Sequence, residues 1–83
     1  MPYLNLLRWH ENASSFTEEE RQVLLALSNE KYRWRRRERI VAVTQLEPSA
    51  VDKALASLMR KEVVRPTFSS KGNIIYGIRE RVG

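Results

Sequence analysis

The strongest constraint on the fold lies in residues 49–62, where apolar side chains recur at the spacing of an α-helix. Spacings of three and four residues place these side chains on one face, which must be buried against a core. Pro48 comes directly before the run and suits the first position of a helix. The apolar positions are Val51, Ala54, Leu55, Leu58 and Met59.

Two further helices are predicted upstream. Thr17 followed three residues later by Glu20 is a capping box, which predicts a helix from residue 17 to about residue 29. A second, shorter helix is predicted over residues 36–45, where the β-branched side chains leave a strand as the alternative. The three helices together supply enough apolar surface for one small core.

Residues 31–35 alternate basic and aromatic side chains with a period of two. This alternation predicts a short extended segment, with Tyr32 and Trp34 turned inward and the arginines turned outward. Trp34 and Tyr76 are interpreted as core residues rather than as platforms on which bases stack.

The last part of the chain predicts a β-hairpin. Residues 63–68 and 74–78 are β-type runs, and the loop between them is rich in turn residues and includes Gly72. Pro66 has no backbone N–H, so its strand is expected at the edge of a sheet.

Eighty-three residues make one domain, predicted here over residues 16–83. Residues 1–15 are interpreted as an apolar N-terminal extension that could form a short helix. A core this small has little room for Tyr3 and Trp9, so two alternatives stay open: residues 1–12 fold onto their own chain, or they form a contact with a second copy of it. The residues expected in such a homodimer contact are Tyr3, Leu4, Leu7 and Trp9.

Composition excludes several classes of chemistry. The chain has no cysteine and one histidine, His10, so neither thiolate sites nor a His-based metal cage or triad can be assembled. We therefore expect a protein without enzymatic activity, metal or cofactor. No apolar run approaches the ~18 residues of a membrane span, and the N-terminus lacks the pattern of a secretion signal. A cytoplasmic protein with no membrane partner is expected.

Charge is divided unevenly along the chain. Residues 1–30 contain two basic and five acidic residues, whereas residues 31–83 contain thirteen basic and five acidic residues. A basic surface confined to one part of a small domain favours a polyanionic partner, and duplex DNA is the partner expected.

Three groups of residues are candidates for DNA contact. An arginine cluster would bind phosphates through bidentate hydrogen bonds from its planar guanidinium groups. The alternative is a solvated face on which the arginine side chains cover the aromatic rings. The outward face of residues 49–61 would enter the major groove, although Asp52 on that face would be repelled by phosphates. The alternative for this face is a surface of small residues that packs on a partner. A lysine at the hairpin tip would add one contact. The candidates are Arg33, Arg35, Arg36, Arg37 and Arg39 in the cluster, Ser49, Lys53, Ser57 and Arg60 on the helix, and Lys71 on the hairpin.

The order of elements and the stretch Ile40–Arg65 resemble the winged helix-turn-helix superfamily of DNA-binding proteins. The spacing Ser49-x-Val51, followed by Leu55, Leu58 and Val63, carries the resemblance. It implies an α+β fold with three main helices and a C-terminal β-hairpin, the wing, and a function in binding DNA and regulating transcription. The superfamily usually has glycine where the third helix ends. This chain has Glu62 there, so a different helix end is expected.

A narrower likeness is to the dissimilatory sulfite reductase D family, compact winged-helix proteins associated with sulfite reductase. Residues 54–64, Ser69-Ser70 and residues 75–78 carry it, together with residues 31–34. This likeness implies the alternative function, a protein-interaction module that docks on an enzyme or a larger assembly. A helper domain that binds nucleic acid without sequence preference is a third interpretation.

Overall fold

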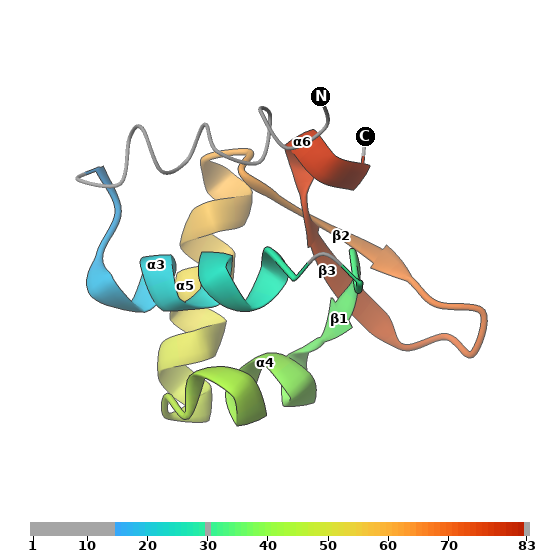
Figure 1. Ribbon diagram of the computed structural model, residues 1–83, viewed down its shortest axis with the longest axis horizontal. Helices are drawn as coiled ribbons and strands as arrows, with labels where there is room; N and C mark the ends of the chain where they lie inside the picture. The colour runs from blue at the N-terminus through green and yellow to red at the C-terminus, as the bar shows by residue number, and fades with distance from the viewer. Residues whose placement is uncertain (1–14, 30, 83) are drawn as a thin grey trace.

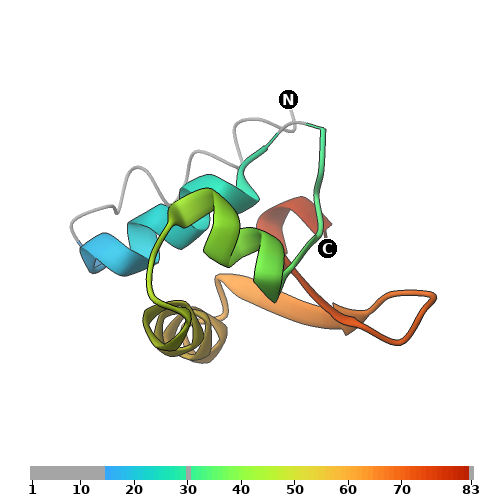
Figure 2. The ribbon, with the colours of Figure 1, turned by 90° about the horizontal axis from the view of Figure 1, so that it is seen from below.

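The computed structural model describes residues 15–29 and 31–82. Within them, three helices pack together and a three-stranded antiparallel sheet flanks them, with its hairpin projecting away from the helices (Figures 1 and 2). The predicted extension, with its dimer contact at Tyr3, Leu4, Leu7 and Trp9, lies outside these residues apart from Ser15. The elements are α3 (Glu18–Leu27), β1 (Arg35–Arg36), α4 (Arg37–Thr44), α5 (Pro48–Arg60), β2 (Val64–Phe68), β3 (Ile74–Ile78) and the single turn α6 (Arg79–Val82).

The α+β class is confirmed, and the arrangement is compatible with a winged helix. The three predicted helices and the two hairpin strands each begin and end within two residues of the predicted bounds. In the short extended segment predicted over residues 31–35, only Arg35 belongs to a strand.

The predicted capping box starts α3. The hydroxyl of Thr17 accepts a hydrogen bond from the backbone N–H of Glu20 at 3.1 Å, and the Glu20 carboxylate accepts one from the backbone N–H of Thr17 at 2.8 Å. Two N–H groups that the helix cannot satisfy internally are thereby paired.

The core forms where α3, α4 and α5 meet the sheet. Four of the five predicted apolar positions of α5 are buried, and the fifth, Met59, is half-buried against the core, as is Tyr76. The interpretation of residues 49–62 as a helix with one buried face is therefore confirmed. The largest fully buried side chains are Val23, Leu24, Leu27, Ile40, Val51, Leu55, Leu58 and Ile78.

The sheet has the strand order β1-β3-β2, so β2 is an edge strand. Pro66 lies in β2, as its missing N–H requires. Two residues of β1 pair with β3, Arg35 opposite Tyr76 and Arg36 opposite Ile75.

The prediction that Tyr32 turns inward is wrong. Its side chain is 49% exposed, because residues 31–34 lie outside any strand and do not continue the alternation of β1. The ammonium of Lys31 and the guanidinium of Arg35 lie 5.6 and 5.3 Å from the centre of its ring. Trp34 is half-buried beside Gly77, where an added Cβ would lie 3.1 Å from the indole ring.

The expectation that α5 ends differently because glycine is missing is also wrong. Glu62 adopts the left-handed conformation, with φ 60°, and its N–H donates to the carbonyl of Met59 at 3.0 Å. The N–H of Val63 donates to the carbonyl of Leu58 at 2.9 Å, which completes a glycine-type helix end without glycine. Helix α4 likewise ends at a left-handed residue, Gln45, with φ 59°.

Gln45→Gly should therefore stabilise the protein by about 0.5–1 kcal/mol. Removing Cβ relieves roughly 1–2 kcal/mol of left-handed strain. Glycine also loses more conformational entropy on folding, which offsets about half of that stabilisation. Gln45→Ala keeps Cβ and should give no gain. Urea unfolding of both variants measures the difference, and equal stability of the two would contradict the strain at this position.

Candidate nucleic-acid interface

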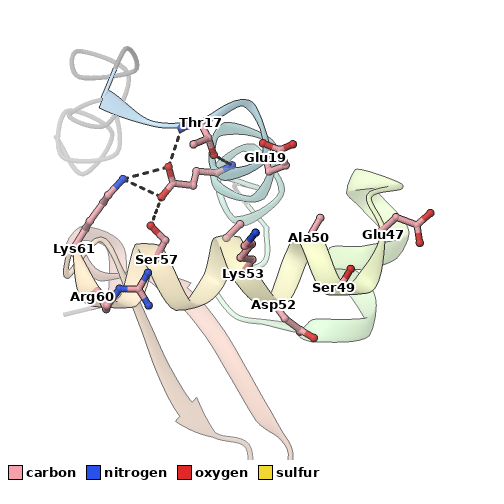
Figure 3. A pocket seen from close by; sticks show the side chains of 12 residues that line it. Thr17, Glu19, Glu47, Ser49, Ala50, Asp52, Lys53, Ser57, Arg60 and Lys61 are labelled. Carbon is pink, nitrogen blue, oxygen red and sulfur yellow. Dashed lines mark hydrogen bonds and ion pairs between the residues drawn. The ribbon is translucent and has the colours of Figure 1, made fainter.

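Helix α5 presents an exposed stripe opposite its buried face. Ser49, Lys53 and Arg60 are exposed along the helix (Figure 3). With the half-buried Ala56 between Lys53 and Arg60, they follow the spacing i, i+4, i+7, i+11. This spacing keeps side chains on one line along a helix. Three of the four residues predicted to read DNA from this helix therefore share one solvent-facing line.

The structure divides the ten predicted contact residues into two groups. Seven are exposed, and their side chains form no hydrogen bond or ion pair with any residue that the structure describes. The other three, Arg35, Arg37 and Ser57, are half-buried and bonded within the fold. The seven exposed residues are Arg33, Arg36, Arg39, Ser49, Lys53, Arg60 and Lys71.

Arg35 fastens the end of α3 to the sheet. Its Nε donates to the carbonyl oxygen of Ala26 at 2.9 Å, and its guanidinium lies against the ring of Tyr32. Because side chains alternate along a strand, Arg35 and Arg36 leave β1 on opposite faces. The arginine cluster is therefore not one continuous strip.

Arg37 forms an ion pair with Asp52. Its Nε and Nη2 donate to the two carboxylate oxygens of Asp52, the second at 3.0 Å, so the pair is bidentate and joins the first turn of α4 to α5. The hydrogen bonds raise the pKa of Arg37 and lower the pKa of Asp52. The negative charge that counted against DNA binding is thus compensated within the fold.

Ser57 turns toward α3 rather than outward with the stripe. Its hydroxyl donates to the carboxylate of Glu20 at 2.7 Å, and the ammonium of Lys61 approaches the same oxygen at 3.0 Å (Figure 3). Lys61 was not among the predicted site residues. Its position four residues after Ser57, on the same side of α5, was the signal available in the sequence.

Glu20 is a buried carboxylate held by three donors. The residue is 2% exposed, and this burial, the largest single influence, raises the pKa of Glu20. The backbone N–H of Thr17, the hydroxyl of Ser57 and the ammonium of Lys61 together outweigh burial and lower the pKa of Glu20 from 4.5 to about 2. The carboxylate therefore remains charged and links the start of α3 to the end of α5.

An open groove runs between the first turn of α3 and the outward side of α5 (Figure 3). Acidic and basic side chains are mixed along it, so it lacks the single charge sign of an anion-binding pocket. No group of three potential metal ligands occurs among residues 15–29 and 31–82. In the same residues, no helix is long and apolar enough to cross a bilayer. The charged residues of the groove are Glu19, Glu20, Glu47, Asp52, Lys53, Arg60 and Lys61.

Comparison of the chain with protein-family models, curated proteins and solved structures gives no match.

Lowering the pH from 4.5 toward 2 should remove the stabilisation that Glu20 provides. The folded pKa of Glu20 lies below the unfolded one, so this contribution is complete above pH 4.5 and disappears as the folded carboxylate gains a proton. The difference between the two pKa values corresponds to about 3 kcal/mol. Urea unfolding between pH 2 and 7 measures it.

Glu20→Gln should lower stability at pH 7 and remove most of the pH dependence in this window. The matched control is Glu19→Gln, because Glu19 is an exposed carboxylate next to Glu20 on the same helix. A Glu20→Gln variant that loses stability on acidification as steeply as the wild type would show that Glu20 does not carry the effect.

Proposed function

We propose that this chain is a winged helix domain that binds duplex DNA through the exposed stripe of α5. The observation that carries the proposal is the line of Ser49, Lys53 and Arg60 on the face opposite the core, free of bonds to the residues that the structure describes. A role in transcriptional control is part of the same proposal.

The size and chemistry of the stripe suit a major groove. That groove admits an α-helix, and arginine, lysine and serine side chains donate to base edges or to phosphates. Ala56, between Lys53 and Arg60, is small enough for close approach. Lys53 and Arg60 supply the positive charge that phosphates attract, and the charge of Asp52 beside them is taken up by Arg37.

The remaining exposed cations would act on the DNA backbone. Arg36 and Arg39 lie at the start of α4, and Lys71 lies in the hairpin loop, so they would contact phosphates outside the stripe. Arg35 and Arg37, which bond within the fold, would position these neighbours, and Ser57 would hold α5 against Glu20.

A protein-docking function is the second candidate. Leu25 on α3 and Val43 on α4 are 51% and 48% exposed, so both apolar side chains face solvent rather than the core. A docking module would use such apolar side chains and would depend little on the stripe of α5. Duplex DNA binding at low salt is the measurement that separates the two functions.

The double variant Lys53→Ala/Arg60→Ala should bind duplex DNA at least about tenfold more weakly at low salt. Each lost phosphate contact also removes about 0.9 from the slope of log affinity against log salt, so the slope should fall by up to about two. Fluorescence anisotropy with a labelled random-sequence duplex, in a series of salt concentrations, measures both quantities.

The matched control is Lys31→Ala/Arg65→Ala, which removes the same net charge from exposed positions outside α5. It should change affinity much less. An equal loss of affinity in the two double variants would show that α5 contributes only net charge. Undetectable binding of duplex DNA by the wild type at low salt would refute the proposal.

Asp52→Asn should raise affinity for duplex DNA by about fivefold. The change removes a negative charge from beside the stripe and releases Arg37 to contact phosphate, an effect of roughly 1 kcal/mol for charges a few ångströms apart in water. Glu19→Gln, a charge change of the same size on α3, should have less effect. An Asp52→Asn variant with weaker binding would instead show that Arg37 must be held by Asp52 to act.

A further inference from the structure

One face of the hairpin contributes side chains to the core, and its row of apolar residues continues along the strands beyond the core. In the register of β2 and β3, residues directly opposite each other share a face, and alternate pairs lie on the same side. The three pairs on this face are Val64 with Ile78, Pro66 with Tyr76, and Phe68 with Ile74.

Exposure rises steeply along this row of apolar pairs. Val64 and Ile78, next to the helices, are 3% and 1% exposed, whereas Phe68 and Ile74, next to the loop, are 72% and 49% exposed. Strand β1 pairs with β3 only at Tyr76 and Ile75, so no strand lies beside Ile74. The hairpin projects as a two-stranded finger (Figures 1 and 2). The pair of Phe68 and Ile74 is thus an uncovered apolar surface on this finger.

The charge around this pair is of one sign. Residues 63–78 contain no aspartate or glutamate and include Arg65 and Lys71, whereas Arg79, at the base of the hairpin, is paired with Glu62. Lys71 is exposed in the loop between Phe68 and Ile74. An apolar tip flanked only by positive charge matches a polyanion with an apolar interior, which is what stacked base pairs inside a phosphate backbone provide.

Shape and size also favour DNA over a protein partner. A stable protein interface buries roughly 800 Å² on each partner around a central apolar area, far more than two side chains at the end of a narrow finger can cover. Proteins that kink DNA insert single apolar side chains of this kind, phenylalanine among them, between base pairs.

We infer that Phe68, supported by Ile74, is a wedge that inserts between two base pairs of the bound duplex and locally unwinds it. Lys71 holds the flanking phosphate. This inference rests on the proposed DNA binding and adds a deformation of the duplex to it. A chain that contacted only phosphates and groove edges would not require an exposed aromatic residue at this position.

Unwinding is measured with the full chain and a closed circular plasmid, which is relaxed by a topoisomerase in the presence of protein at low salt. After protein removal, the wild type should leave a linking-number change that grows with the amount bound. Phe68→Ser should abolish this change while lowering affinity by about tenfold or less, because the lost contact is offset by the unstacking that no longer occurs. Phe68→Leu, which keeps an apolar side chain, should retain much of the change.

Lys71→Ala is the matched control on the same loop. It should weaken binding and flatten its salt dependence, yet leave the linking-number change per bound chain unaltered. If Phe68→Ser and the wild type produced the same linking-number change at equal amounts of bound protein, the inference that Phe68 is a wedge would be overturned. Binding of the wild type without any linking-number change would also overturn it and leave the proposed DNA binding intact, whereas absence of duplex binding would refute both.

Discussion

The buried carboxylate of Glu20 helps to fix how α5 is turned about its own axis, and the exposed stripe depends on that orientation. The buried apolar side chains of α5 select the face that meets the core. The bonds to Glu20 add a directional constraint, because a buried charge that loses a donor is left unsatisfied. Ser57 and Lys61 bond Glu20 from one side of α5, which leaves Ser49, Lys53 and Arg60 directed to solvent.

The sequence was sufficient to predict the helices, the hairpin and the buried face of α5, because apolar spacing, the capping box and Pro48 act locally. Tyr32 could not be placed in this way. Its orientation depends on where β1 begins, which is set by pairing with β3 some forty residues later. The partners of Glu20 are equally distant in the chain: the capping box locates Glu20 at the start of α3, but only the packing of α3 on α5 brings Ser57 and Lys61 to it.

The arginine cluster shows why a count of charges predicted the candidate site only in part. Consecutive arginines leave a strand on opposite sides, so Arg35 bonds the end of α3 while Arg36 is exposed. The helix that follows directs Arg37 to Asp52. Net charge predicts attraction to a polyanion at long range, whereas the contacts are decided by the few cations that the fold leaves unpaired.

Two residues in the left-handed conformation, Gln45 and Glu62, flank α5, and they differ in the bonds that their side chains form. Glu62 accepts a hydrogen bond from Arg79 at 2.8 Å, so its side chain ties the end of α5 to the first residue of α6, directly after β3. Gln45 is equally strained and exposed, and its side chain has no such bond among the residues that the structure describes. The left-handed conformation of Gln45 instead ends α4, since its backbone N–H donates to the carbonyl of Val41 at 2.8 Å. The strain at Gln45 is therefore compensated by a backbone bond at the helix end alone, whereas the strain at Glu62 is compensated by a side-chain bond as well.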